Sequence, residues 1–496
     1  MKKREQWGSR IGFILAAVGS AIGVGNIWRF PYVIYENGGG AFLIPYLLAM
    51  VTAGIPLMIL EFGVGHKYRG SAPRIFSTIS RKWEWLGWWQ VFIAWIISLY
   101  YIAVIAWAVC YVSFAFNIGW GEDTNAFFFK EFLALSDSPF HLSSIRWMIL
   151  AAIAFCWFIC WVGLMGGIKR GIEVANKIFM PTLFIILLII VIQAVSLPGA
   201  DQGLNWMWKP DFSKILDYKT WTAAYGQMFY SLSVGFAIMM TYASYLPKDS
   251  DINNNACLTV FLDCGFSMLA GIMIFSVLGN MALNKGIPMT EVVSSGVGLA
   301  FITIPQAINS LPMPAVFGTL FFVALCTAGL SSEISLNEVV VSAFMDKTTH
   351  SRRTIVSFYC LFGFLISAIF ATGGGLLILD IVDYFINSFG ILFAALIEII
   401  FLGWVCNLKM FREHVNSTSD FVVGSWWNIC LRYITPALLG YMAVANLVKE
   451  MTTPYGGYPL NALLTLGWFI VIVIIPLAFF LQSKTKAYKK NSGETK

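Results

Sequence analysis

Two stretches of glycine and small polar residues, 19–26 and 231–236, have the composition of an ion-binding site. The first reads GSAIGVGN and the second SLSVGF. Glycine costs about 1 kcal/mol relative to alanine inside a helix, so both stretches favour local unwinding. Unwound backbone within a membrane offers carbonyl groups to a cation and N–H groups to an anion. The alternative is that the glycines only allow neighbouring helices to pack closely.

The elements that carry these stretches are apolar and long. Of the 496 residues, 58% are hydrophobic and 12% are charged, which excludes a soluble enzyme, and the 16% aromatic content excludes a disordered chain. A membrane span needs about 20 apolar residues. Twelve segments qualify, at 11–35, 41–65, 88–117, 146–165, 171–194, 219–246, 252–283, 314–345, 354–372, 376–404, 425–448 and 459–482. We therefore expect an all-α polytopic membrane protein.

The distribution of basic residues predicts the orientation. An even number of spans places both termini on one side, and Lys and Arg concentrate on that side, at the N-terminus, in 66–87, in 346–353 and in the tail. By the positive-inside rule both termini are cytoplasmic. The net charge of +6 is then a topology signal, and we expect no nucleic-acid partner. The nine cysteines lie in or beside apolar segments, which predicts free thiols.

The two glycine-rich stretches lie at corresponding positions, in the first and sixth segments. This pattern indicates an inverted-repeat transporter whose binding site is near the middle of the membrane. The predicted repeats are 11–194 and 219–404, followed by helices in 425–482 and a cytoplasmic tail at 483–496. Residues 1–446 and 447–496 are not separable as folding units.

Longer motifs resemble those of the neurotransmitter:sodium symporter family. They are Trp7-x-Ser9-Arg10, GVGNIWRFP at 23–31, ENGGGAF at 36–42, Tyr100-Tyr101, the 227–236 stretch, TYASY at 241–245 and AGLSS at 328–332. The resemblance covers nearly the whole chain. It implies the leucine-transporter fold, with a five-plus-five inverted repeat, two further helices, and helices 1 and 6 unwound at mid-membrane. It also implies sodium-coupled uptake by alternating access.

The resemblance implies two sodium sites with oxygen ligands, as a hard cation requires. The first comprises the Ala21 carbonyl, Asn26, Ser231, Asp263 and the substrate carboxylate. The second comprises the carbonyls of Gly19, Ile22 and Ala328 and the hydroxyls of Ser331 and Ser332.

Asp263 departs from the family pattern, which usually has Asn at this position. Chloride-dependent members bind an anion beside it, at positions that match Tyr46, Gln227, Ser231 and Ser267. Chloride-independent bacterial members commonly carry Glu where this chain has Ser267. A carboxylate inside a membrane is costly and by default functional. We therefore expect Asp263 to replace chloride; the alternative is a protonated, structural Asp263.

The resemblance also implies the substrate class. Monoamine transporters of the family have Asp where this chain has Gly23, so here the substrate must bring its own carboxylate. An α-amino acid fits, and an uncharged pocket favours a neutral, hydrophobic or aromatic L-amino acid. The implied substrate contacts are Ser20, Ala21, Val24, Gly25, Ile97, Tyr101, Tyr230, Ser231, Ser233, Phe236, Ser332 and Leu336.

Gates are implied at both ends of the pathway. Arg29 and Asp383 match the external ion pair, with Asp380 as the alternative acid. The internal gate matches Arg4, Asp346, Trp7 and Tyr245. Glu61 matches an acid that hydrogen-bonds the unwound part of the sixth helix, whereas Glu333, Glu338 and Glu398 receive no role.

We expect a plasma-membrane symporter, not an enzyme, that uses Na⁺ (two ions) and no organic cofactor. Its expected partners are an amino-acid substrate and the lipid bilayer. A rival hypothesis is an amino-acid sensor or receptor on the same fold, which would bind substrate without net flux.

Overall fold

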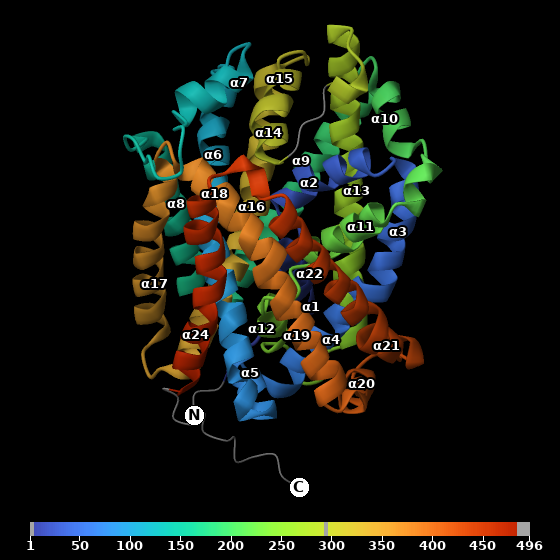
Figure 1. Cartoon of the computed structure of the whole chain (residues 1–496), viewed down its shortest axis with the longest axis vertical. Coiled ribbons are helices and arrows are strands. Elements are labelled where there is room, and N and C mark those ends of the chain that lie inside the picture. The colour runs from blue at the N-terminus through green and yellow to red at the C-terminus, as the bar shows by residue number, and fades with distance from the viewer. Residues whose placement is uncertain (1–3, 292–295, 484–496) are drawn as a thin grey trace.

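The computed structural model describes residues 4–291 and 296–483, and this part of the chain is an elongated bundle of helices without a named strand (Figure 1). The predicted tail at 484–496 lies outside the described residues. Among those described, ten helical stretches are long and apolar enough to cross a membrane. They are Gly40–Tyr68, Arg81–Ala115, Trp147–Met165, Ile168–Val195, Ile252–Lys285, Pro314–Lys347, Arg352–Ala371, Gly375–Val405, Ser425–Gly457 and Leu460–Ser483.

The two remaining predicted segments are both interrupted. The first is divided into α1 (Arg10–Ala21) and α2 (Val24–Glu36), which are bent by 53° and together form an eleventh candidate span. The segment at 219–246 is divided into α11 (Tyr218–Ser231) and α12 (Ile238–Ala243), neither of which is long enough to span alone. The all-helical class is confirmed, whereas the count of twelve and the repeat boundaries stay predictions.

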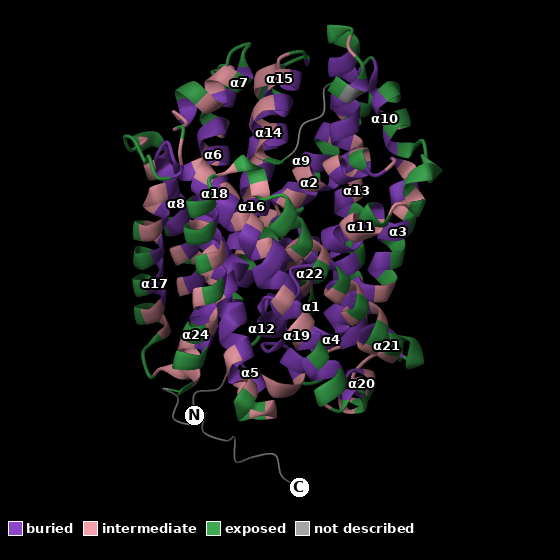
Figure 2. Cartoon of the chain, viewed as in Figure 1, coloured by how far each residue is buried: buried purple, intermediate pink, exposed green. Residues whose placement is uncertain are grey.

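Long helices form the centre of the bundle. The helices longer than 14 residues are α6 (Glu84–Ala115), α8 (Trp147–Met165), α9 (Glu173–Val195), α13 (Ile252–Lys285), α16 (Pro314–Lys347), α17 (Arg352–Ser367), α22 (Thr435–Thr452) and α24 (Phe469–Ser483). Helix α16 packs along both α6 and α9, and α1 packs against α9, α13 and α16. Their apolar side chains are buried against one another, so the core lies along the bundle axis (Figure 2).

Shorter helices complete the bundle. They are α3 (Leu43–Ala49), α4 (Ile55–Tyr68), α5 (Ala72–Ile79), α10 (Ala200–Trp208), α15 (Ile304–Ile308), α18 (Gly375–Phe385), α19 (Leu392–Ile400), α20 (Leu408–Ser417) and α21 (Ser425–Ile429). Very short helices lie at α7 (Thr124–Ala126), α14 (Gly296–Gly298) and α23 (Leu460–Ala462). The nine cysteines are free thiols, as predicted.

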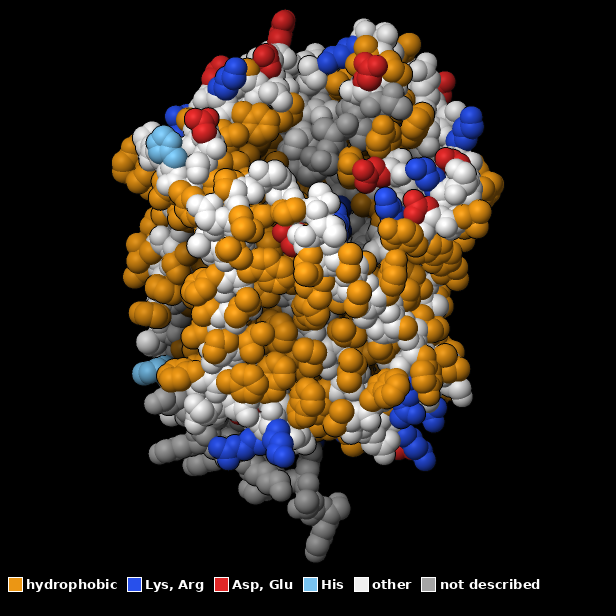
Figure 3. All heavy atoms as spheres, viewed as in Figure 1, with side chains coloured by type: hydrophobic (Ala, Val, Ile, Leu, Met, Phe, Trp, Pro, Cys, Tyr) orange, Lys and Arg blue, Asp and Glu red, His pale blue; other side chains and the backbone are white. Residues whose placement is uncertain are grey.

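The outside of the bundle matches a bilayer. Figure 3 shows hydrophobic side chains around the middle of the molecule, with Lys and Arg at the lower end and charges of both signs at the upper end. The described ends of the chain meet at one end of the bundle. Arg4 and Arg74 both pair with Asp346, while the Trp85 N–H donates to Gln482 near the end of α24. This common location is what an even number of crossings requires.

A histidine pair joins α4 to α20, a short helix outside the candidate spans. His66 Nε2 lies 2.7 Å from the carbonyl oxygen of Pro247, so it must donate, and His66 Nδ1 then accepts from His414 Nε2 at 3.1 Å. In this arrangement the accepting His66 ring is neutral. Burial, the neighbouring His66 and Lys67 together lower the pKa of His414 to about 4.

The histidine pair predicts acid sensitivity of the fold. Because the pKa of His414 is lower in the folded state than in the unfolded chain, its stabilising effect is complete above about pH 6.5 and is lost as the pH falls toward 4. His414→Gln should remove part of the difference in melting temperature between pH 7 and pH 5, by about 2 °C. The control is the exposed His350→Gln. An unchanged pH dependence in His414→Gln would contradict the assignment.

Candidate functional site

The break in the first span creates a cluster of oxygen atoms. Helix α1 ends at Ala21, and Gly23 is extended, with φ −114° and ψ −173°, before α2 begins. Because the helix stops here, carbonyl groups near its end turn toward α16. The Ser332 hydroxyl oxygen lies 3.3 Å from each of four carbonyl oxygens, those of Gly19, Ser20, Ile22 and Ala328. One hydroxyl proton serves only one of them, so the cluster is rich in unshared oxygen lone pairs, as a hard cation prefers.

This cluster contains four of the five predicted ligands of the second sodium ion. The fifth, Ser331, donates its hydroxyl to Asn176 Oδ1 at 2.5 Å. Asn176 lies on α9 and was not predicted, because nothing in the local sequence relates it to the 328–332 motif. A side chain at Gly19 would come within 2.3 Å of the Ser331 hydroxyl, so glycine is required for this close approach.

The break in the sixth span is held open by an acid. Between α11 and α12, Ser233, Gly235 and Ala237 all have positive φ, of 54°, 88° and 69°. The Gly235 N–H donates to Glu61 Oε1 on α4 at 2.7 Å, and the Ser233 hydroxyl donates to the Ser20 carbonyl at 2.9 Å. The first contact is the one predicted for Glu61. The second joins the two breaks to each other.

A second polar cluster surrounds Asp263, which is completely buried on α13. The Asn26 amide nitrogen lies 2.8 Å from Asp263 Oδ1, 2.9 Å from the Ser231 hydroxyl and 2.8 Å from the Ser267 hydroxyl. The Ser231 hydroxyl donates to Asp263 Oδ2 at 2.6 Å. Three predicted ligands of the first sodium ion, Asn26, Ser231 and Asp263, therefore meet, together with Ser267 from the predicted anion set.

The other two members of that anion set, Tyr46 and Gln227, are also buried. The Tyr46 hydroxyl lies 3.5 Å from the sulfur of Cys264, the residue after Asp263. The side-chain oxygen of Gln227 on α11 has no hydrogen-bond partner among the described residues. Gln227 thus shares α11 with Ser231, whereas Tyr46 reaches α13 from α3 through Cys264.

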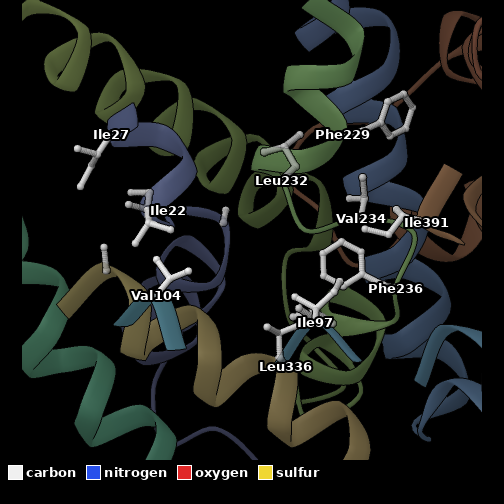
Figure 4. Close-up of a cluster of buried hydrophobic side chains, with 14 of the residues drawn as sticks. Ile22, Ile27, Ile97, Val104, Phe229, Leu232, Val234, Phe236, Leu336 and Ile391 are labelled. Carbon is white, nitrogen blue, oxygen red and sulfur yellow. The ribbon is translucent and has the colours of Figure 1, made fainter. Parts of the chain in front are cut away.

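A cavity of about 310 Å³ lies between the breaks. All twelve residues predicted to contact the substrate line it: Ser20, Ala21, Val24, Gly25, Ile97, Tyr101, Tyr230, Ser231, Ser233, Phe236, Ser332 and Leu336. The Val24 N–H donates to the Tyr101 hydroxyl at 3.2 Å. Figure 4 shows Ile97, Phe236 and Leu336 close together, although they come from α6, the sixth-span break and α16.

Other lining residues were missed by the sequence analysis. Val104 lies two helical turns after Ile97 on α6, so helical spacing could have identified it. Ile391 comes from the helical stretch before α19, far along the chain, and no local signal points to it. Both add apolar surface to the cavity.

The predicted external gate residues, Arg29 and Asp383, also line this central cavity, but they do not form an ion pair with each other. The Arg29 guanidinium lies over the Tyr230 ring, 3.9 Å from the ring centroid. Asp383 accepts from the Tyr100 hydroxyl at 2.7 Å and from Asn387 at 2.7 Å. Within the described chain no ion pair shorter than 4 Å joins Arg29 to Asp383. The predicted pair is thus separated in this conformation, because each partner is held by other groups.

The alternative acid is also occupied. Asp380 accepts from Tyr455 and Tyr458 hydroxyls at 2.9 and 2.8 Å, and both tyrosines follow α22. Asp380 therefore connects α18 to that loop, although it lines the same cavity as Asp383.

The residues predicted for the internal gate are joined by several direct contacts. Arg4 contacts Asp346 at 3.2 Å and lies 4.6 Å from the centroid of the Tyr245 ring. The Trp7 indole donates to the Tyr242 carbonyl at 2.9 Å, and the Trp7 N–H donates to the Tyr245 carbonyl at 3.2 Å. All four residues predicted for the internal gate, Arg4, Trp7, Tyr245 and Asp346, thus lie together. The residues predicted for the internal gate are thus in contact, whereas those predicted for the external pair are apart.

The three acids without a predicted role are all buried with polar partners. Glu338 accepts from the Tyr245 hydroxyl at 2.8 Å and forms an ion pair with Arg352 at 2.5 Å, so it supports the internal gate. Glu398 accepts from Gln90 at 2.5 Å, and Glu333 accepts from Asn337 at 3.1 Å. The partners of Glu338 and Glu398 are distant in sequence, whereas Asn337 lies one helical turn after Glu333 on α16.

The chain is similar in sequence to known sodium-dependent transporters. The family model described as the sodium:neurotransmitter symporter family matches residues 4–127 and 121–486. An uncharacterized sodium-dependent transporter of Methanocaldococcus jannaschii is 43% identical over 492 residues, which cover 99% of both chains. The human sodium- and chloride-dependent GABA transporter 2 is 30% identical, over 95% of this chain and 86% of its own. The Caenorhabditis elegans sodium-dependent dopamine transporter is 29% identical, over 92% and 82%.

Proposed function

Because the chain belongs to the sodium:neurotransmitter symporter family, we propose that it imports a neutral, hydrophobic or aromatic L-amino acid together with sodium. Transport occurs across the cell membrane by alternating access, with both termini in the cytoplasm. The arrangement of the gate residues, with the external pair apart and the internal gate joined, supports this cycle.

The observation that carries the substrate class is the environment of Gly23. A Cβ atom there would lie 3.1 Å from the Tyr101 hydroxyl and 3.3 Å from the Ser332 hydroxyl, so the position supplies no side chain to the cavity. Without an acid at this point, a bare amine has no counter-charge among the deep contacts. A zwitterion brings its own carboxylate, which fits the first sodium ion and the N–H groups at the start of α2.

The rest of the cavity favours an apolar side chain. Ile97, Val104, Phe236 and Leu336 add apolar surface to the cavity, whereas the charged residues that line it, Arg29, Asp380 and Asp383, belong to the predicted external gate. A charged substrate side chain would have to lose its hydration without gaining a partner. We therefore propose a neutral, hydrophobic amino acid.

Two sodium ions are proposed, one at each oxygen cluster. With a tenfold sodium gradient and a membrane potential of about 100 mV, each ion supplies about 3.7 kcal/mol. Two ions supply about 7 kcal/mol, enough for roughly a 10⁵-fold gradient of a zwitterion. No organic cofactor enters this scheme.

The decisive experiment is uptake of a panel of labelled amino acids into proteoliposomes, with and without an inward sodium gradient. We expect sodium-stimulated accumulation of at least one hydrophobic or aromatic amino acid. Sodium-dependent binding without accumulation would instead support the sensor hypothesis.

Amine analogues test the substrate class separately. Tryptamine and tyramine lack the carboxylate, so they should compete at least about a hundredfold more weakly than tryptophan and tyrosine, because an unpaired charge is left in the site. Competition binding in sodium measures this difference. Equal displacement by the amine and its parent amino acid would refute the proposed role of Gly23.

A further inference from the structure

A second cavity, of about 380 Å³, lies away from the transport pathway. We call it the outer cavity, and it is lined by Phe114, Phe127, Glu131, Phe132, Ile145, Arg146, Trp147, Met148 and Ile149. These residues come from the end of α6, from the helical stretch Phe127–Phe132 and from the start of α8. The outer cavity shares no residue with the central one.

Its position is at the edge of the bilayer. Trp147 is the first residue of a candidate membrane span, so the outer cavity lies where that span leaves the apolar layer. Trp147 is 72% exposed, and Ile145 and Met148 are more than 40% exposed. Tryptophan and apolar side chains exposed at this level contact lipid at the membrane–water boundary.

One wall of the outer cavity is aromatic. The Phe114 ring lies 5.1 Å from that of Phe127 and 5.7 Å from that of Phe132, both centroid to centroid and both edge-on. This packing keeps the wall in place, and its apolar surface suits an acyl chain.

Arg146 holds a fixed positive charge at the mouth. Its Nε donates to the Phe132 carbonyl at 3.0 Å, and its Nη2 donates to the Glu131 carbonyl. Its Nη1 has no hydrogen-bond partner among the described residues, and the backbone of Arg146 is tied to Ala371 at 2.7 Å. A guanidinium with a free face is suited to phosphate.

Glu131 places the opposite charge in the same cavity. Its carboxylate has no hydrogen bond or ion pair within the described chain, and no ion pair within 4 Å joins it to Arg146. The outer cavity therefore offers a separated cation and anion next to an apolar wall.

We propose that the outer cavity binds phosphatidylethanolamine. The phosphate contacts Arg146, the primary ammonium donates to Glu131, and an acyl chain lies on the aromatic wall. Phosphatidylglycerol has no cation for Glu131, and the quaternary ammonium of phosphatidylcholine has no N–H to donate. This inference goes beyond the proposed transport function and does not depend on it.

The test is lipid binding to the full-length, delipidated protein, measured by native mass spectrometry with three lipids that share the same acyl chains. We expect phosphatidylethanolamine to bind about tenfold more tightly than phosphatidylcholine or phosphatidylglycerol, since one charged hydrogen bond distinguishes them. Equal binding of the three lipids would overturn the proposal.

Single variants test the two proposed contacts separately, the phosphate with Arg146 and the ammonium with Glu131. Glu131→Gln should remove the preference over phosphatidylglycerol without disturbing the fold, because the carboxylate makes no internal contact. Arg146→Gln should weaken binding of all three lipids, because each carries a phosphate, whereas Arg146→Lys should retain part of it. The matched control is Lys130→Gln, an exposed charge on the same stretch that does not line the outer cavity.

The competing ligand is a free amino acid, which is also a zwitterion with an apolar part. Titration with phenylalanine or tryptophan tests it. If an amino acid displaces phosphatidylethanolamine from wild type, and Glu131→Gln abolishes the displacement, then the outer cavity is an amino-acid site and the lipid assignment is wrong.

Discussion

Replacing Asp263 with Asn should make uptake dependent on chloride. In the wild type, the buried carboxylate accepts from Asn26 and Ser231, and we propose that it supplies a permanent negative charge beside the first sodium ion. The amide of Asn keeps an oxygen for sodium but removes the charge. An unbalanced buried charge costs several kcal/mol, so uptake without chloride should fall about a hundredfold or more.

Chloride should restore part of this loss. The hydroxyls of Ser231 and Ser267 and the amide of Asn26 already meet at this point, so they form a neutral donor cluster once the carboxylate is gone. Wild-type uptake should be the same in chloride and in gluconate. The control is Asp201→Asn, an exposed acid on α10, which should not gain chloride dependence.

A protonated Asp263 makes a different prediction. If Asp263 carries a counter-transported proton, wild-type uptake should respond to an opposed pH gradient, and Asp263→Asn should lose that response without gaining a response to chloride. Uptake by both variants across chloride and pH gradients distinguishes the two. Chloride-dependent uptake by the wild type would contradict both hypotheses.

Asp383→Asn should abolish most transport but retain sodium-dependent binding. In the structure Asp383 is held by Tyr100 and Asn387, and Arg29 lies on Tyr230, so neither is tied to the other. Closure requires them to meet. The amide preserves the hydrogen bond to Tyr100 but not the attraction to Arg29, and we expect uptake to fall at least tenfold while binding changes no more than about threefold.

Asp380→Asn is the matched control, because Asp380 lines the same cavity but is held by Tyr455 and Tyr458. It should transport nearly as well as wild type. If Asp380→Asn loses transport and Asp383→Asn does not, then Asp380 is the partner of Arg29. Equal loss of binding and transport in Asp383→Asn would indicate direct contact with the substrate instead of a gate.

Sequence patterns were sufficient to predict those features of the fold that depend on a short stretch of the chain. Ten of the twelve predicted segments correspond to continuous candidate spans, because an uninterrupted apolar run in a membrane has to satisfy its backbone internally as a helix. The two breaks occur at Ala21–Val24 and Ser231–Ile238, within the stretches rich in glycine and serine. Glycine's freedom at positive φ is used at Gly235, where a side chain would also collide with Ala395.

Contacts between distant residues were harder to foresee. The Asn176–Ser331 bond joins α9 to α16, the Glu338–Arg352 pair supports the internal gate, and the His66–His414 pair connects α4 to a short helix far along the chain. No spacing or motif relates the partners in the first and third pairs. They depend on how the helices pack.

The membrane class, the positions of the helices and the two breaks follow from the amino-acid sequence, because hydrophobic length and backbone preference are properties of short segments. The residues around the central cavity were expected only because longer motifs resemble those of the symporter family. Which partner each predicted gate residue contacts depends instead on the tertiary structure. Arg29 lies on Tyr230 while Asp383 bonds to Tyr100, and at the other end Arg4 contacts Asp346. A residue with several compatible partners takes the one that packing brings within reach, and only the assembled bundle specifies which one that is.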